Sequence, residues 1–202
     1  MLSLLALPLL VGSKCAFFFS SGGGSSDKDK NDSQNEVIVV ASGYFGDPRT
    51  EGVSYASGSL SGVTGKDGLF QYEAGKSIRF FIGDINLGTV RAGQSLVTPQ
   101  DLVAVGGSGS TAAINISRLL LSLDSQPGDS AITIPKSARL SAVRSNAAVS
   151  SDIAFLDFSD DTSFANNASQ LVAVLTQDYT FTAVLVDAGT ASASRLKTPS
   201  KD

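Results

Sequence analysis

The sequence contains no histidine, no tryptophan and a single cysteine, Cys15. Without histidine it lacks the commonest general base and cannot form a Ser-His-Asp triad. One cysteine is too few for the ordinary zinc sites or for an internal disulfide. Charged residues are also scarce, at 17% with a net charge of −4, so the composition gives binding to nucleic acid no electrostatic support. We therefore expect no cofactor, no bound metal and no enzymatic activity.

What the chain does contain is enough for one hydrophobic core. Its 202 residues are 42% hydrophobic, which suits a single domain. Serine, glycine, alanine and threonine are abundant, while lysine and glutamate are few. This composition is typical of exported bacterial proteins.

The first 20 residues have the pattern of an export signal. Leu2 to Val11 form an apolar run of about ten residues, the length of a signal-peptide core and too short to span a bilayer. Cys15 follows, in the order found in bacterial lipoproteins, where this cysteine is lipidated and becomes the mature N-terminus. Cys15 is therefore the candidate lipidation site, and a lipid anchor or signal segment would bring the protein to a membrane.

The match to a lipoprotein signal is incomplete, and two other export routes fit. Lys14 and Gly12 stand where other residue types are usual, and no basic residue precedes the apolar run. The alternatives are an ordinary signal peptide cut near Ser20–Gly24 and an uncleaved anchor extended through Phe17–Phe19.

Residues 21–36 have the composition of a flexible tether. The stretch is rich in serine, glycine and aspartate and nearly free of apolar residues, so it cannot bury enough surface to offset its chain entropy. A tether behind a membrane-proximal cysteine lets a folded domain stand away from the membrane. The alternative is a disordered N-terminus without a role.

Residues 37–97 have the pattern of an antiparallel β-sandwich or a small barrel, with short alternating segments and glycine-containing turns. Gly43–Pro48 is expected to be a loop. The Asp-Gly pair in Gly65–Gly68 predicts a two-residue hairpin turn with a positive φ at Gly68. The expected strands are Val37–Val40, Val53–Ser57, Leu69–Glu73, Ser77–Ile82 and Ile85–Val90. The residues expected to share a face within their strands are Val53, Tyr55 and Ser57, then Phe70 and Tyr72, then Ile78, Phe80 and Ile82.

Several motifs follow one another between Gly43 and Ile134. A hairpin motif is formed by Gly62, Thr64, Gly68, Phe70, Tyr72 and Gly75, and it resembles that of prealbumin-like, carboxypeptidase-regulatory β-sandwiches. The motifs that continue from it are Ile82-Gly83, Leu87-Gly88, Val97–Val103 and Asn115–Asp124. With these, the chain resembles an uncharacterised family of bacterial envelope lipoproteins and surface repeats. The resemblance implies a prealbumin-like sandwich and a place in the cell envelope, but no particular activity.

Residues 98–198 are expected to form three or four helices that pack on the sheet within the same cooperative unit. Thr98 is expected to cap a helix that begins at Pro99. Ser110 or Thr111 is expected to cap a second helix that ends near Leu123, with Arg118 projecting away from its apolar stripe. That stripe consists of Ile116, Leu119, Leu120 and Leu123.

The remaining elements are predicted less sharply by the sequence. Ile132–Ile134 is expected to be a short strand and Lys136–Arg144 one or two helical turns. Phe164–Leu175 is expected to be a helix capped by Asp161 or Ser163. Tyr179–Val186 fits either a strand or the start of a last helix.

Two groups of carboxylates are candidates for chemistry. In the resembled family the loop at Asp124–Asp129 often carries calcium-binding aspartates, but only these two remain here, so we expect a plain loop. Asp157, Asp160 and Asp161 would have to be held in a cleft to act as a catalytic pair, and a helix cap explains them better.

We expect a non-enzymatic protein of the bacterial periplasm, outer membrane or cell surface that acts as a tethered binding or scaffolding module. Its contact surface is expected in the loops Tyr44–Arg49 and Ser57–Gly62, because loops on a rigid scaffold usually carry binding. The named residues are Tyr44, Phe45, Asp47 and Arg49. The partner would be an envelope protein or a glycan. The alternatives are an accessory component of an envelope transport or adhesion assembly and, less favoured, a carboxylate-based hydrolase.

Overall fold

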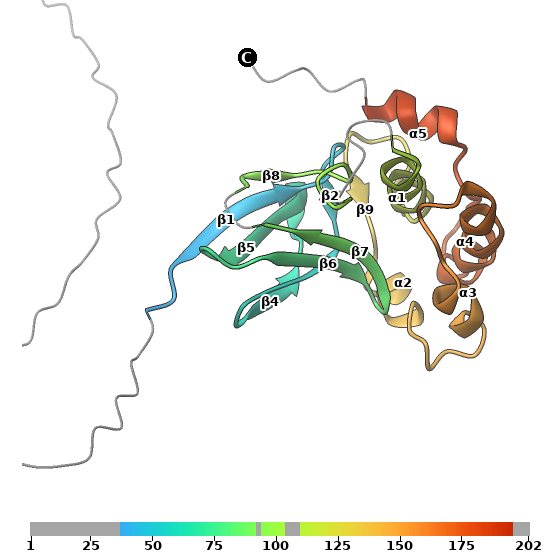
Figure 1. The fold of residues 1–202 in the computed structure, drawn as a ribbon. Helices are drawn as coiled ribbons and strands as arrows, with labels where there is room; N and C mark the ends of the chain where they lie inside the picture. The colour runs from blue at the N-terminus through green and yellow to red at the C-terminus, as the bar shows by residue number, and fades with distance from the viewer. Residues whose placement is uncertain (1–36, 92–93, 104–109, 196–202) are drawn as a thin grey trace, which may run out of the picture. The chain divides into compact units, whose positions relative to one another are not determined.

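The computed structural model describes residues 37–91, 94–103 and 110–195 (Figure 1). In these ranges a strand region comes first and the helices follow, with one short strand among them. The predicted α+β class is therefore confirmed. All described residues belong to one compact unit that begins at Val37. The expected export signal with Cys15 and the expected tether lie outside the described residues.

Four strands form an antiparallel sheet with one apolar, buried face. In spatial order they are β4 (Leu60–Val63), β3 (Ser54–Ser57), β6 (Ile78–Ile82) and β7 (Ile85–Val90). Ile78, Phe80 and Ile82 are fully buried, as their alternation predicted. Tyr55 and Ser57 of β3 are also buried, again as predicted.

Three strands form a smaller, mixed sheet. β1 (Val40–Phe45) pairs antiparallel with β5 (Leu69–Glu73) on one side and parallel with β8 (Leu96–Val97) on the other. A separate parallel pair joins β2 (Thr50–Glu51) to β9 (Ile132–Thr133). This pair ties the strand region to the part of the chain that carries the helices.

Aromatic rings from the two larger sheets contact each other. Phe45 of β1 stacks on Phe80 of β6 with ring centroids 4.5 Å apart. Phe70 of β5 meets Phe80 edge-on at 5.1 Å and lies 5.8 Å from the ring of Tyr55 in β3. Aromatic pairs at these separations contribute attraction beyond the area they bury.

The boundaries of β1 correct the prediction. The strand begins at Val40, after the expected start at Val37, and continues into Phe45, where a loop was expected. Gly43 does not form a turn, and its lack of a side chain lets the Phe70 ring lie close to the backbone of β1. It pairs with Phe70, whose ring would come within 2.7 Å of a Cβ at this position.

The turn at Gly65–Gly68 is not the predicted hairpin. It is a single 3₁₀ turn, η1 (Lys66–Gly68), that carries the chain from β4 in the larger sheet to β5 in the smaller one. The prediction failed because Ser57–Gly62 was taken for a loop, whereas it holds most of a β3–β4 hairpin. The positive φ predicted at Gly68 is confirmed, at 73°.

Helices are the main regular elements of the described chain after β8. They are α1 (Thr111–Ser122), α2 (Lys136–Ser141), α3 (Ser150–Ala154), α4 (Asp161–Leu175) and α5 (Ala188–Arg195). Ser110 caps α1 as predicted, because its hydroxyl accepts a hydrogen bond of 3.2 Å from the N–H of Ala113. The predicted stripe of α1 is buried, and Leu119 and Leu123 in it are 0% exposed. None of the described helices has the length and hydropathy needed to cross a membrane.

Other local predictions were wrong. Thr98 begins a turn without a helix, in which the carboxylate of Asp101 accepts from both the N–H and the hydroxyl of Thr98 at 2.7 Å. The cap of α4 is Asp160, one residue before Asp161 and three before Ser163, the two expected caps. Tyr179–Val186 is neither a strand nor a helix.

Arg118 is the largest correction in the helical region. It was expected to project away from the core, but it is 7% exposed. Its Nε donates to the carbonyl of Val186 at 2.7 Å, and its Nη1 donates to Asn115 at 2.9 Å and to the carboxylate of Asp161 at 2.7 Å. The guanidinium also lies 5.1 Å from the centre of the Phe164 ring.

The η1 turn can be tested with one substitution and a matched control. A Cβ at Gly68 would collide with the carbonyl oxygen of Phe45, whereas Gly75 has a similar φ of 85° and no atom within 4 Å of its Cβ position. We expect Gly68→Val to lower the free energy of unfolding by more than about 1 kcal/mol. Urea unfolding should show a smaller loss for Gly75→Val. Equal losses would mean that Gly68 is not tightly packed.

The docking of α1 on the strands gives a second prediction. Leu120 is 2% exposed, so Leu120→Ala should lower the free energy of unfolding by about 2–5 kcal/mol. Leu140, which is 64% exposed in α2, supplies the control, and Leu140→Ala should change stability by less than about 0.5 kcal/mol. A fragment ending at Val105 should show no cooperative melt. A cooperative melt would refute the expectation that strands and helices form one unit.

Candidate functional site

The predicted contact loop Tyr44–Arg49 has exposed and buried members. Tyr44 is 41% exposed, and the guanidinium carbon of Arg49 lies 4.7 Å from the centre of its ring. Asp47 is half-buried. Phe45 is fully buried, so its side chain cannot take part in a contact surface. Tyr44, Asp47 and Arg49 are the members that the structure leaves at the surface.

The second predicted loop, Ser57–Gly62, is held in place by a buried carboxylate. Glu73 accepts hydrogen bonds from the N–H of Ser59 at 2.9 Å and from its hydroxyl at 3.2 Å, and Lys76 lies 3.9 Å away. The bond from the Ser59 N–H keeps the pKa of Glu73 below its ordinary value, and the Ser59 hydroxyl and Lys76 act in the same direction. This segment is therefore a fixed hairpin.

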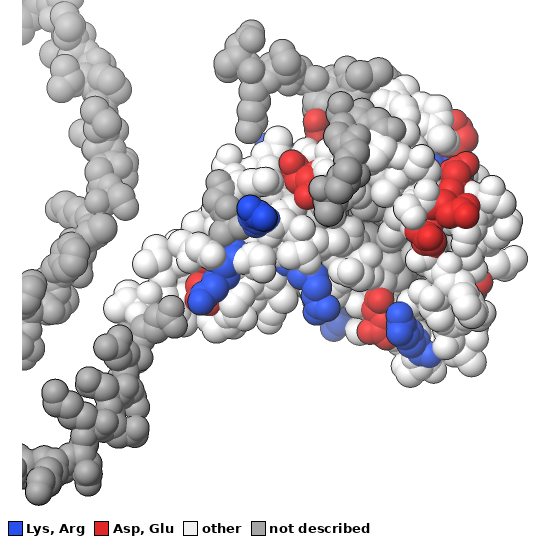
Figure 2. Space-filling view, in the orientation of Figure 1, with Lys and Arg blue, Asp and Glu red and all other residues white. Residues whose placement is uncertain are grey.

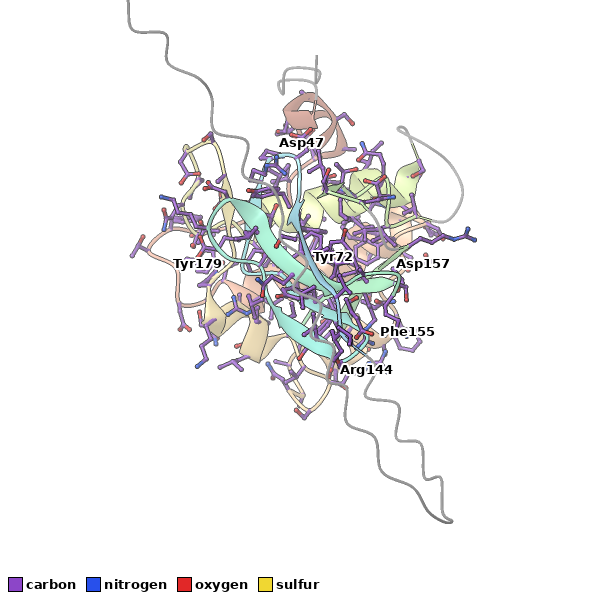
Figure 3. All side chains as sticks on the ribbon, turned by 90° about the vertical axis from the view of Figure 1, so that its left-hand side faces the viewer. Asp47, Tyr72, Arg144, Phe155, Asp157 and Tyr179 are labelled. Carbon is purple, nitrogen blue, oxygen red and sulfur yellow. The ribbon has the colours of Figure 1, made fainter. Side chains whose placement is uncertain are left out.

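A cleft of about 450 Å³ lies beside the first loop, and we call it the Pro48 cleft. Asp47, at the top of Figure 3, marks this end of the described structure. The cleft is bounded by the Asp47–Pro48 loop, by α1, by the Asp124–Ile132 segment and by the chain around α5. Its principal lining residues are Pro48, Leu121, Asp124, Asp129, Ile132 and Val186.

A narrower cavity adjoins the Pro48 cleft. It includes Asp47, and it shares Pro48, Leu121, Ile132 and Ser194 with the cleft. Through it, Asp47 of the predicted contact surface lies next to the Pro48 cleft. Of the four named contact residues, Asp47 lines the narrower cavity, and Tyr44, Phe45 and Arg49 line neither hollow.

The lining of the Pro48 cleft is mainly apolar and includes several polar groups. Leu121, Ile132 and Val186 supply aliphatic surface, and Thr190 and Ser194 supply hydroxyls. An apolar wall with a few polar groups, in a volume of about 300–1,000 Å³, is the usual make-up of ligand sites. The cleft therefore has the size and lining for a short peptide segment or a sugar.

The two carboxylates of the cleft, Asp124 and Asp129, accept hydrogen bonds from nearby backbone N–H groups. Asp124 is 9% exposed, and its Oδ1 accepts from the N–H groups of Gln126 and Thr133, both at 3.0 Å. Asp129 accepts from the N–H of Ala131 at 3.0 Å and is exposed. Such bonds between aspartate and nearby backbone N–H groups fix loops. In the described ranges no three histidine, cysteine, aspartate or glutamate residues gather as a metal site would require.

Tyr179 lies next to the start of the Asp124–Asp129 loop. Its hydroxyl donates to the carbonyl of Leu123 at 2.6 Å. Burial, together with the nearby negative charge of Asp124, raises the pKa of Tyr179 to about 12. The phenol therefore acts as a fixed neutral donor at physiological pH.

Asp157, Asp160 and Asp161, the carboxylates considered for a hydrolase, each make a hydrogen bond or an ion pair within the fold. Asp157 accepts from the hydroxyl and the N–H of Ser159 at 2.7 and 2.8 Å, and these bonds, the hydroxyl's above all, keep the pKa of Asp157 below its ordinary value. Asp160 caps α4, and Asp161 pairs with Arg118. A general acid needs a raised pKa, so Asp157 does not suit that role. In Figure 3, Asp157 lies well away from Asp47 and hence from the Pro48 cleft.

Charge is unevenly distributed over the described surface. In Figure 2, aspartate and glutamate gather over the helices at the right of the view, while lysine and arginine lie mostly over the strands. The acidic side fits the composition, since aspartates outnumber lysines and arginines in the segment 110–194. A cationic partner would therefore be favoured on the helical side.

Sequence reasoning missed most of the Pro48 cleft. Leu121 lies off the predicted stripe of α1, and Val186 and Ser194 carry no motif. The only signal was the turn chemistry of Asp47–Pro48 and Asp124–Asp129, which marks loops but not their proximity. No family model, no curated protein and no solved structure matches this chain. The family resemblance thus depends on the quoted motifs alone.

The raised pKa of Tyr179 predicts an alkaline effect on stability. The unfolded chain loses this proton near pH 10, whereas the folded protein keeps it to about pH 12. Stability should therefore fall as the pH rises from 10 to 12, because the unfolded state binds fewer protons there. Denaturant unfolding of Tyr179→Phe should show a weaker fall than the unsubstituted protein. Parallel curves would contradict the assigned burial and hydrogen bond.

Proposed function

We propose that this protein is a non-enzymatic binding or scaffolding module of the bacterial cell envelope, tethered through its N-terminal segment. The observation that carries the binding role is the Pro48 cleft, to which the predicted Asp47 loop and the Asp124–Asp129 loop both contribute. An envelope protein segment or a glycan is the partner whose chemistry fits a mainly apolar cleft that also presents hydroxyls and carboxylates.

The strand region supports the proposal of a prealbumin-like sandwich. Phe45 and Phe70 come from the smaller sheet, and Phe80 and Tyr55 come from the larger one. Their rings meet at 4.5 to 5.8 Å, as the inner faces of two stacked sheets would. A rigid sandwich suits a module that holds its loops in place for binding.

The order of segments along the chain supports the tether. An apolar run, then Cys15, then a stretch of serine, glycine and aspartate precede the folded unit that begins at Val37. Lipidation of Cys15 would place this unit outside the cytoplasmic membrane, in the periplasm or at the outer membrane or cell surface. The mass-spectrometric signature of that route is an acylated N-terminal cysteine.

An accessory role in an envelope transport or adhesion assembly is the second candidate. The acidic helical side favours it, since a larger assembly would use more surface than one cleft. In that case the same membrane attachment is expected, but the partner would contact the helices as well as the cleft.

The proposal is tested by photo-cross-linking in native membranes. A photoreactive residue at Ser130, an exposed position on the cleft, should capture a protein or glycan partner. The same residue at Ser151, exposed in α3 and outside the cleft, should not. Leu121→Lys should abolish capture from Ser130, and because Leu121 is half-buried and packs against the core, circular dichroism should confirm that this variant is folded.

Fractionation of the same cells tests whether the protein is attached to a membrane through its N-terminal segment. The protein should fractionate with membranes, carry an N-terminus at Cys15, and become soluble when Cys15 is replaced by serine. An intact Met1 on soluble cytoplasmic protein would refute the envelope role. Equal capture from Ser130 and Ser151 would refute the cleft as the binding site and favour the assembly role.

A further inference from the structure

Residues 177–183, which follow α4, line two neighbouring hollows on the helical part of the described chain. The first has a volume of about 360 Å³ and is lined by this segment and by the C-terminal end of α4. The second has a volume of about 220 Å³ and is lined by the same segment and by Pro135, which precedes α2. Tyr179 and Thr180 line both hollows, and we call the two together the Tyr179 groove.

The Tyr179 groove is a different site from the Pro48 cleft. The two have no lining residue in common among those that the structure describes. In Figure 3, Tyr179 lies at the left of the view, whereas Asp47, next to the Pro48 cleft, lies at the top. A ligand in the groove therefore uses side chains that the cleft does not.

Two aromatic rings give the groove an apolar surface that is held in place. The ring centroids of Tyr179 and Phe181 lie 5.4 Å apart, with an angle of 57° between the ring planes. The hydroxyl of Tyr179 donates to the carbonyl of Leu123 at 2.6 Å, which fixes the first ring. Phe181 is 37% exposed, although phenylalanine is usually buried, so the second ring offers aromatic surface to a ligand.

Several exposed polar side chains of the groove make no hydrogen bond within the described chain. They are Gln177, Asp178, Thr180 and Thr182. Other aspartates of the helical region behave differently, since Asp157, Asp160 and Asp187 each accept a hydrogen bond from a nearby backbone N–H. The donors and acceptors in the groove therefore serve neither a cap nor a turn and can bond to a ligand.

Aromatic rings beside groups that both donate and accept match the chemistry of a sugar. The C–H groups on one face of a sugar ring pack on an aromatic ring, and the hydroxyls around its rim donate and accept hydrogen bonds. We propose that the Tyr179 groove binds an uncharged glycan. One sugar ring packs on Phe181, and its hydroxyls bond to the side chains of Gln177, Asp178 and Thr182.

The lining of the groove disfavours other classes of ligand. An acyl chain would remove Gln177 and Asp178 from water without giving them a hydrogen-bond partner, which costs free energy. An acidic glycan would meet the carboxylate of Asp178, and the described lining contains no lysine or arginine to offset that repulsion. An uncharged glycan avoids both costs.

An introduced tryptophan can report on the groove, because the chain has none of its own. In the full chain, Phe181→Trp keeps an aromatic ring at the proposed contact, and its fluorescence should shift on titration with an uncharged tetrasaccharide. The uncharged probes are cellotetraose, mannotetraose and chitotetraose, and tetragalacturonate and tetra-alanine are the comparisons. Phe155→Trp should show no shift, since Phe155 is 69% exposed but lies across the view from Tyr179 in Figure 3.

A second pair of variants tests the hydrogen bonds. In the Phe181→Trp chain, Thr182→Val removes one hydroxyl and should weaken binding about fivefold, as expected for the loss of one hydrogen bond. Thr162→Val makes the same change at an exposed position outside the groove and should leave the affinity unchanged. Circular dichroism should confirm that the variants are folded. If Phe181→Trp is not, titration calorimetry compares the unsubstituted protein with Thr182→Val and Thr162→Val.

A response to at least one uncharged tetrasaccharide, weakened by Thr182→Val alone, would support the proposal. The proposal is overturned if no uncharged probe binds at concentrations up to about 10 mM, where even weak sites fill. A response to tetragalacturonate or tetra-alanine alone, equal responses from the two tryptophan variants, or equal affinities of the two valine variants would overturn it as well. Because the groove and the Pro48 cleft share no described lining residue, none of these outcomes decides whether Ser130 captures a partner.

Discussion

The burial of one charged side chain, Arg118, governs how the C-terminal part of the chain is arranged. A guanidinium removed from water costs several kcal/mol unless acceptors surround it. Its acceptors here come from α1 itself, from the first residue of α4 and from the segment before α5. The Asp161 side chain is 62% exposed, so solvent screens that ion pair, and the carbonyl of Val186 and the amide of Asn115 contribute the unscreened part. Three segments distant in sequence are thereby held at one point.

The burial of Arg118 also explains why only the apolar side of α1 was predicted correctly. Its apolar stripe follows a helical period, so periodicity located it correctly. The opposite side is polar in sequence yet buried, because Asn115 donates to the carbonyl of Phe158 and Ser122 accepts from the N–H of Val186. These side chains supply hydrogen bonds to irregular backbone, which is why the segment around Val186 needs neither a helix nor a sheet. Periodicity cannot detect such a face, since its partners lie far along the chain.

In the strand region, side-chain alternation and turn chemistry predicted buried faces and one turn glycine, but they did not predict which strands pair. Alternation found the buried faces of β3, β5 and β6, and turn chemistry found the positive φ of Gly68. Strand β4 was missed because Gly62 was interpreted as a loop residue. It is a glycine because the Tyr55 side chain covers it, 2.6 Å from where a Cβ would lie. Gly43 under the Phe70 ring is the same case. A glycine required by a neighbour cannot be told from a turn glycine by sequence alone.

The Pro48 cleft depends on contacts that cross between the two regions, which is why no local pattern predicted it. The β2–β9 pair sets the Asp47–Pro48 loop against the Asp124–Ile132 segment. Thr64 secures the β2 side, since its hydroxyl donates to the carbonyl of Thr50 at 2.8 Å and accepts from the N–H of Val53 at 2.9 Å. Arg139 secures the other side through the carbonyls of Gly52 and Ile134, at 3.2 and 2.9 Å. The cleft walls therefore exist only when strands and helices are docked. A ligand held between them would bind the docked state alone, and its binding free energy would add to the stability of that docking.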